Sequence, residues 1–133
     1  MQYRKFALAF IFIWFIVGGL AHFVATDFFL RIVPPDWPLR IQAVYVSGFF
    51  ELAGALGLLH PGLRRAAGIG LLMLTIAVSP ANIYMWLNPE LFPAIPSVIL
   101  TLRLALQVVL LAGIWWATRP EIDAQPRQAH VKH

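Results

Sequence analysis

Cysteine is absent from this sequence of 133 residues. The chain itself therefore cannot carry a thiol–disulfide relay, an iron–sulfur cluster held by thiolates, or a catalytic cysteine. The sequence also lacks a phosphate-binding loop, a zinc-ligand spacing and a nucleophile-elbow motif. We therefore predict no catalytic residues and no metal site, and any redox chemistry would have to belong to a bound cofactor or a partner.

Charged residues are scarce, at 12% of the chain, whereas 60% of the residues are hydrophobic. An average soluble protein is about half apolar and about a quarter charged. Each of four continuous apolar runs is close to the roughly 20 residues that a helix needs to cross a bilayer. The sequence predicts an all-α integral membrane protein, an antiparallel four-helix bundle, with helices at about 6–25, 42–59, 66–87 and 97–118.

The distribution of lysine and arginine predicts the orientation of this bundle. The first apolar run is longer than the core of a secretory signal and no clear A-x-A site follows it, so we expect an uncleaved first helix. The basic residues outside the helices are Arg4, Lys5, Arg64, Arg65, Arg119, Arg127 and Lys132 on one side, against Arg31 and Arg40 on the other. The positive-inside rule then places both termini in the cytoplasm. The net charge of +4 thus reflects topology, and we expect no nucleic-acid partner.

The connecting segments differ in length and character. The turn around Pro61 is so short that the second and third helices must be antiparallel neighbours. The longer segment 26–41 contains three prolines and is predicted to lie at the lipid headgroups, with Trp37 as an anchor. Pro80 is expected to kink the third helix. The polar tail 119–133 is predicted to be disordered.

Each predicted helix carries a polar residue in the same half of the membrane. By the helical rise, His22, Glu51, Asn82 and Arg103 lie about 6–13 Å below one face. Gln107 follows Arg103 by one helical turn. These five residues are the predicted intramembrane polar cluster, which could bind a ligand.

Glu51 is the unexpected member of this cluster, because an isolated carboxylate at that depth costs about 2.5–3.5 kcal/mol on insertion scales. Arg103 is the only cationic residue at matching depth, so the sequence predicts an ion pair surrounded by the other polar groups. The pair could be a functional site, or it could only fix one helix against another. A lone His22 could ligate a metal or relay protons, but a hydrogen-bonded helix contact is the favoured interpretation.

Several stretches resemble the DoxX-like family of small bacterial membrane proteins: "GGLAHF", "SGFFELAGALGLL", "RRAAGIGLLMLTIAVSPANIYM" and "LRLALQVVLL". The resemblance covers about residues 5–118 and places the predicted polar cluster on the family's polar positions. It implies a bacterial cytoplasmic (inner) membrane protein, an accessory or assembly component of a membrane redox system. A quinone would then be a candidate cofactor, and membrane oxidoreductase subunits would be candidate partners.

The sequence leaves three kinds of function open. The first is this accessory role, with a quinone-like or other small amphipathic ligand in the polar cluster. The second is small-solute or proton-coupled binding or transport, and the third is a purely structural role in the membrane. A role without catalysis of its own is favoured, and a homo-oligomer is left open along with the identity of the ligand.

Overall fold

The structure, a computed structural model, describes residues 1–120 and is helical throughout its regular elements. Most of the predicted tail, residues 121–133, lies outside the described residues. The elements, in chain order, are α1 (Gln2–Val24), α2 (Thr26–Ile32), α3 (Arg40–Leu59), α4 (Arg64–Leu87), the 3-10 helix η1 (Pro89–Leu91) and α5 (Ser97–Thr118). The all-α prediction is confirmed, with α2 and η1 as additions.

Four of these helices, α1, α3, α4 and α5, are long and apolar enough to cross a membrane. Their C-terminal ends fall within one residue of the predicted ends. Three of them start two to four residues earlier than predicted. The added segments begin with the polar or basic residues Gln2, Arg40 and Arg64. The prediction missed them because it used the apolar runs alone, and a helix can continue past such a run.

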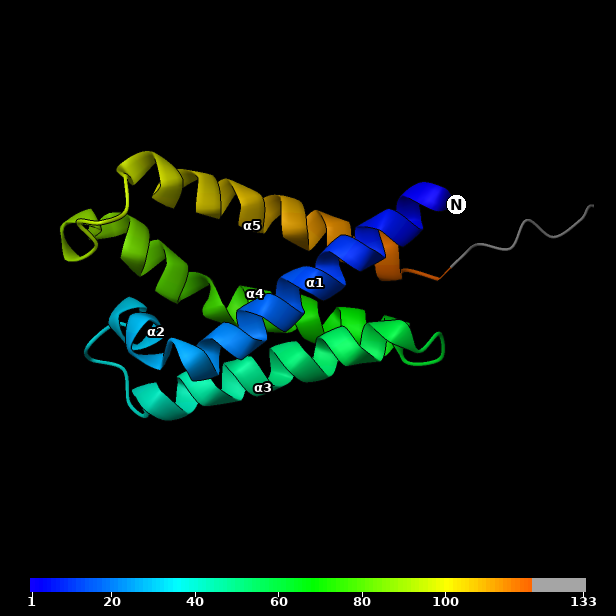
Figure 1. Ribbon diagram of the computed structural model, residues 1–133, viewed down its shortest axis with the longest axis horizontal. Coiled ribbons are helices and arrows are strands. Elements are labelled where there is room, and N and C mark those ends of the chain that lie inside the picture. Colours follow the sequence, from blue (N-terminus) through cyan, green and yellow to red (C-terminus); the bar gives the residue numbers. More distant parts are fainter. Residues whose placement is uncertain (121–133) are drawn as a thin grey trace, which may run out of the picture.

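The four long helices run antiparallel and pack in the circular order α1, α3, α4, α5 (Figure 1). The start of α1 and the end of α5 lie at one end of the bundle, which we call the terminal end. The opposite end carries α2, η1 and the start of α5, and we call it the α2 end. In this order α3 and α5 are diagonal, so the interior of the bundle lies between them.

The terminal half of the bundle is filled by apolar side chains. One buried cluster joins all four long helices and consists of Ile11, Phe15, Ala55, Leu58, Leu71, Leu110, Ile114 and Ala117. Arg4 ties the start of α1 to the end of α5 by donating hydrogen bonds to the carbonyl oxygens of Ala117 (2.8 Å) and Arg119. Between helices in a membrane, close van der Waals packing of such side chains stabilises the contact.

The α2 end is closed by a second, smaller cluster. Ile32 of α2 packs with Met85, Phe92 and Leu100, so the segment between α1 and α3 folds back over the end of the bundle. Arg40 holds α2 in place by donating hydrogen bonds to the carbonyl oxygens of Leu30 and Val33. The sequence did not predict this helix, whose seven residues are too few to register as an apolar run.

Large apolar side chains cover the outside of the bundle. Ile13, Val17, Met73, Val108 and Val109 are each more than half exposed, and all lie on the long helices. Exposed apolar surface on this scale is unusual for a protein in water and suits contact with lipid.

Candidate functional site

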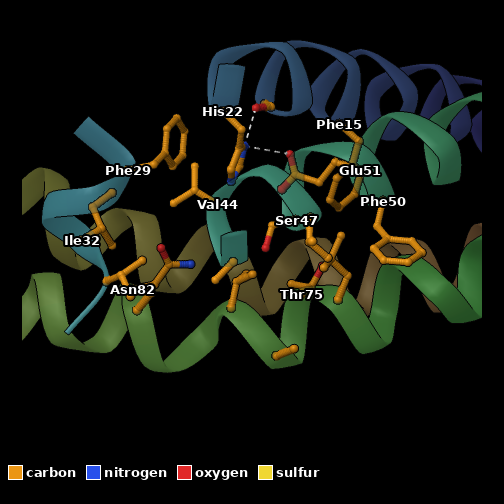
Figure 2. Close-up of a pocket in the computed structure, with 18 of the residues that line it drawn as sticks. Phe15, His22, Phe29, Ile32, Val44, Ser47, Phe50, Glu51, Thr75 and Asn82 are labelled. Atoms are coloured by element: carbon orange, nitrogen blue, oxygen red, sulfur yellow. Dashed lines mark hydrogen bonds and ion pairs between the residues drawn. The ribbon is translucent and has the colours of Figure 1, made fainter. Parts of the chain in front are cut away.

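A cavity of about 560 Å³ lies between the packed terminal half and α2. Its walls come from α1, α2, α3, α4 and α5, and most of its lining side chains are apolar or aromatic. The polar residues of the lining are His22, Ser47, Glu51, Thr75, Asn82, Arg103 and Gln107. All five residues of the predicted cluster therefore meet at one cavity, and Figure 2 shows several of them converging on it.

Two members of the cluster, Asn82 and Gln107, are hydrogen-bonded to each other. The Asn82 side-chain amide donates a hydrogen bond to Gln107 Oε1 at 2.6 Å, which joins α4 to α5. Gln107 Nε2 donates to the Ser79 hydroxyl and lies 3.4 Å from the Thr75 carbonyl oxygen. Both polar ends of Gln107 are therefore used within the protein, and this residue mainly holds two helices together.

His22 is fixed in orientation by its neighbours. Its Nδ1 lies 2.7 Å from the Gly18 carbonyl oxygen, which can only accept, so Nδ1 carries the hydrogen. The ring stacks on Phe29 of α2, with centroids 3.9 Å apart and planes inclined by 20°. Nε2 is then the ring nitrogen left for a ligand, and Figure 2 shows it on the cavity side.

Glu51 is nearly buried, at 9% exposed, and one of its carboxylate oxygens accepts no hydrogen bond from the described residues. Glu51 Oε2 lies 3.4 Å from His22 Nδ1, but the hydrogen on that nitrogen is directed to Gly18. Among residues 1–120, no group makes a hydrogen bond to Oε2. The second oxygen is turned towards the cavity (Figure 2). A buried acceptor without a partner is costly, by about 1–3 kcal/mol, and such groups are rare in folded proteins.

The predicted direct ion pair between Glu51 and Arg103 is not formed. Arg103 Nη1 instead lies 3.6 Å from Met85 Sδ, a weak acceptor, and this is the only hydrogen bond of its guanidinium within the described chain. No described carboxylate is within ion-pair distance of Arg103. The reason is the order of the helices: α3 and α5 are diagonal, so the two charges face each other across the cavity.

Ser47 and Thr75 also line the cavity, and sequence reasoning did not assign them to a site. The Ser47 hydroxyl makes no hydrogen bond within residues 1–120 and lies one helical turn from Glu51 on the cavity wall (Figure 2). Thr75 Oγ1 donates to the Leu71 carbonyl oxygen at 2.7 Å and is less available. The spacing of four residues between Ser47 and Glu51 was the signal that could have identified Ser47.

The cavity therefore presents both kinds of hydrogen-bonding group to a ligand. Glu51 and the Nε2 atom of His22 can accept, Arg103 can donate several hydrogen bonds, and Ser47 can do either. The rest of the wall is apolar, which is the usual composition of a small-molecule pocket. No group of three His, Asp or Glu side chains that could hold a metal ion occurs in the part of the chain that the structure describes.

A family model described as "Domain of unknown function (DUF8561)" matches residues 11–119, so the chain belongs to this family. The match spans all four long helices and the cavity between them. No curated protein and no solved structure matches the chain. The family description assigns no activity, and it leaves the resemblance to DoxX-like proteins untested.

Proposed function

We propose that this member of the DUF8561 family is a multi-pass protein of the bacterial cytoplasmic membrane that binds a small amphipathic ligand in the cavity at the α2 end. A quinone-like ring is the leading candidate for the ligand. In this proposal the protein is an accessory component of a membrane redox system and not an enzyme by itself. The role in redox chemistry is drawn from the DoxX-like sequence stretches, whereas ligand binding is argued from the cavity.

One observation carries the binding proposal: Glu51 lies in the wall of a largely apolar cavity with one oxygen turned towards it, and no group within residues 1–120 makes a hydrogen bond to its buried Oε2. Across the cavity, the Arg103 guanidinium donates a hydrogen bond only to the thioether sulfur of Met85 within the described residues. A structural ion pair would have satisfied both groups with each other. A ligand with a hydroxyl to donate to Glu51 and an oxygen to accept from Arg103 would satisfy both, and a quinol or semi-reduced quinone ring has these groups.

The volume and the lining support a small ligand. About 560 Å³ falls within the range of about 300–1,000 Å³ that is typical of small-molecule pockets. Aromatic residues Trp14, Phe29, Trp37 and Phe50 supply flat apolar surface on which a ring can stack.

Transport is the weaker candidate, because the cavity is bounded at the terminal end by the buried apolar cluster that includes Phe15, Leu71 and Leu110. A transporter must open its site to each side in turn. The dense half of the bundle would have to separate for this to happen. We therefore expect no pH-coupled uptake of small polar solutes by the protein in proteoliposomes, and measured uptake would favour transport over binding alone.

The binding proposal can be tested through the tryptophans at the cavity wall. Decylubiquinol, the reduced form of a quinone with a short tail, should change the fluorescence of Trp14 and Trp37, and this change should saturate. Glu51→Gln and Arg103→Leu should each weaken binding by roughly tenfold to a hundredfold, since the loss of a hydrogen bond to a charged group costs about 1.5–3 kcal/mol.

Glu90→Gln provides the matched control, because Glu90 is exposed on η1 and does not line the cavity. This variant should bind as the native chain does. Mass spectrometry of molecules retained through mild purification would identify the natural ligand. A fluorescence change that does not saturate, or that is the same in all variants, would contradict the proposal.

A further inference from the structure

The seam between α3 and α4 is closed at the terminal end. A Cβ atom added to Gly57 would lie 2.8 Å from the Cβ atom of Ala67, and one added to Gly54 would lie 2.5 Å from Leu71. Carbon atoms do not approach this closely, so a side chain at either position would clash with Ala67 or Leu71 of α4. The glycines therefore let the α4 side chains pack directly against the backbone of α3.

The same two helix faces continue towards the α2 end, but there they part. On α3 the continuing residues, at spacings of three and four, are Phe50, Val46 and Ala43, and on α4 they are Leu74, Val78 and Ala81. All six line the cavity. Phe50 and Val46 are also 54% and 52% exposed. Half-exposed side chains in the cavity lining favour an opening of the cavity sideways between α3 and α4.

Three other boundaries of the cavity are held by direct contacts. Between α1 and α3, a Cβ atom on Gly48 would lie 2.7 Å from His22 Cβ, so these helices touch at the level of the cavity. Between α4 and α5, the hydrogen bond from Asn82 to Gln107 bridges the gap. At the α2 end, Ile32 and Val33 are buried over the cavity.

We propose that the ligand enters and leaves sideways from the bilayer, between α3 and α4, and that it carries one long apolar tail. This inference rests on the proposed binding function and specifies its ligand class: a membrane-dissolved lipid whose head is a hydroxyl- or carbonyl-bearing ring. The head lies at Glu51 and Arg103, and the tail passes between Phe50 and Ala77 into the lipid. A water-soluble molecule would not enter from the lipid through an apolar opening. A long apolar tail, in contrast, is most stable when it stays in the apolar opening and the surrounding lipid.

The chemistry of the head follows from the two charges in the cavity. A fatty acid would offer an acceptor to Arg103 but would place a second carboxylate in the same apolar cavity as Glu51, and like charges repel most strongly in a low dielectric. A ring with hydroxyl and carbonyl oxygens can donate to Glu51 and accept from Arg103 at the same time.

A bulky residue at the opening tests the route. Ala77→Trp fills the space between α3 and α4, whereas Ile76→Trp places the same side chain next to it on the lipid-facing surface, where Ile76 is 61% exposed and outside the cavity lining. The probes are decylubiquinol and the same ring without its tail. Ala77→Trp should raise the ratio of the two dissociation constants by roughly tenfold, about what the loss of two buried methylenes produces. Ile76→Trp should leave that ratio unchanged.

Photolabelling of the unaltered protein tests the same route without a variant that could misfold. Decylubiquinone with an azide at the end of its tail should label peptides from 43–50 and 74–81, and excess decylubiquinone should compete for the labelling. Labelling of α1 or α5 alone, or an equal effect of the two tryptophan variants, would overturn the side entrance while leaving the binding function intact. Failure of both probes to bind would overturn the binding function itself.

Discussion

At the scale of the residue, glycine is what allows α1 and α3 to touch. A Cβ atom on Gly48 would lie 2.7 Å from His22 Cβ and 3.1 Å from the Gly19 carbonyl oxygen. Neither neighbour can move without separating the two helices, so Gly48→Ala should lower the free energy of unfolding by about 1–3 kcal/mol. The measurement is thermal unfolding in detergent, followed by circular dichroism.

Gly113 on α5 serves as the control for this substitution, because a Cβ atom there meets nothing within 4 Å. Gly113→Ala should leave the stability unchanged or raise it by up to about 1 kcal/mol, since alanine favours the helix. Equal destabilisation by the two variants would mean that the contact between α1 and α3 is looser than the structure shows.

Glu51 allows a site to be distinguished from an architectural pair. A buried carboxylate without a full set of partners destabilises the folded protein, and a glutamine of the same shape is less costly to bury. Glu51→Gln should therefore maintain or raise the thermal unfolding temperature while it weakens decylubiquinol binding. If Glu51 were half of a structural ion pair, the same change would cost about 3–5 kcal/mol instead. Measuring unfolding and binding on one preparation decides between these outcomes.

The depth of each polar residue could be predicted from the sequence, but its partners could not. Helical rise was enough to place Glu51 and Arg103 in the same half of the bundle, and both line one cavity. Which side chains meet depends on the order of the helices around the bundle, and no local pattern in the sequence encodes that order. Because α3 and α5 are diagonal, Glu51 contacts His22 of α1 instead. Asn82 and Gln107, expected around the ion pair, bind each other because α4 and α5 are adjacent.

At the scale of the element, the tie between α4 and α5 is a chain of polar side chains. Gln107→Leu would leave the Asn82 amide without its partner in an apolar interior, while the Ser79 hydroxyl would keep its hydrogen bond to the Thr75 carbonyl oxygen. The expected loss is about 1–3 kcal/mol in the free energy of unfolding in detergent. The double variant Asn82→Leu/Gln107→Leu should lose less than the sum of the two single variants, because it removes both ends of the contact. Strict additivity would show that the hydrogen bond contributes nothing to helix packing.

The long helices were predictable and the short ones were not, for a physical reason. A span of about 20 apolar residues is imposed by the thickness of the bilayer and remains visible in any window of the sequence. In contrast, α2 is helical because Ile32 packs on Met85 and Phe92, and because Arg40 binds its last carbonyl oxygens. These are tertiary contacts with distant parts of the chain. Pro80 does lie inside α4, as predicted, and its effect on the helix axis stays a prediction.

At the scale of the whole molecule, the bundle is dense at the terminal end and hollow at the α2 end. The glycine contacts Gly54–Leu71 and Gly57–Ala67 bring α3 and α4 together at the dense end. Close packing at the dense end stabilises the fold. This stabilisation compensates for the cost of a buried group such as Glu51 at the hollow end. Functional sites commonly carry such local costs, compensated by packing elsewhere.

The two ends of the bundle also differ in charge, and this difference predicts the orientation of the protein in the membrane. Arg4, Lys5, Arg64, Arg65 and Arg119 lie at the terminal end, whereas the α2 end has Arg31 and Arg40 together with Asp27, Asp36 and Glu90. The positive-inside rule then places the terminal end in the cytoplasm and the cavity in the outer half of the membrane.

A fluorescent protein that matures only in the cytoplasm should therefore be active when fused after His133. Alkaline phosphatase, active only outside, should work when inserted near Pro35. Because α1 starts and α5 ends on the same side and α2 lies on the other, two reporters active on one side would contradict the four-span topology itself. Inversion of both signals would leave the bundle intact and move the cavity to the cytoplasmic half.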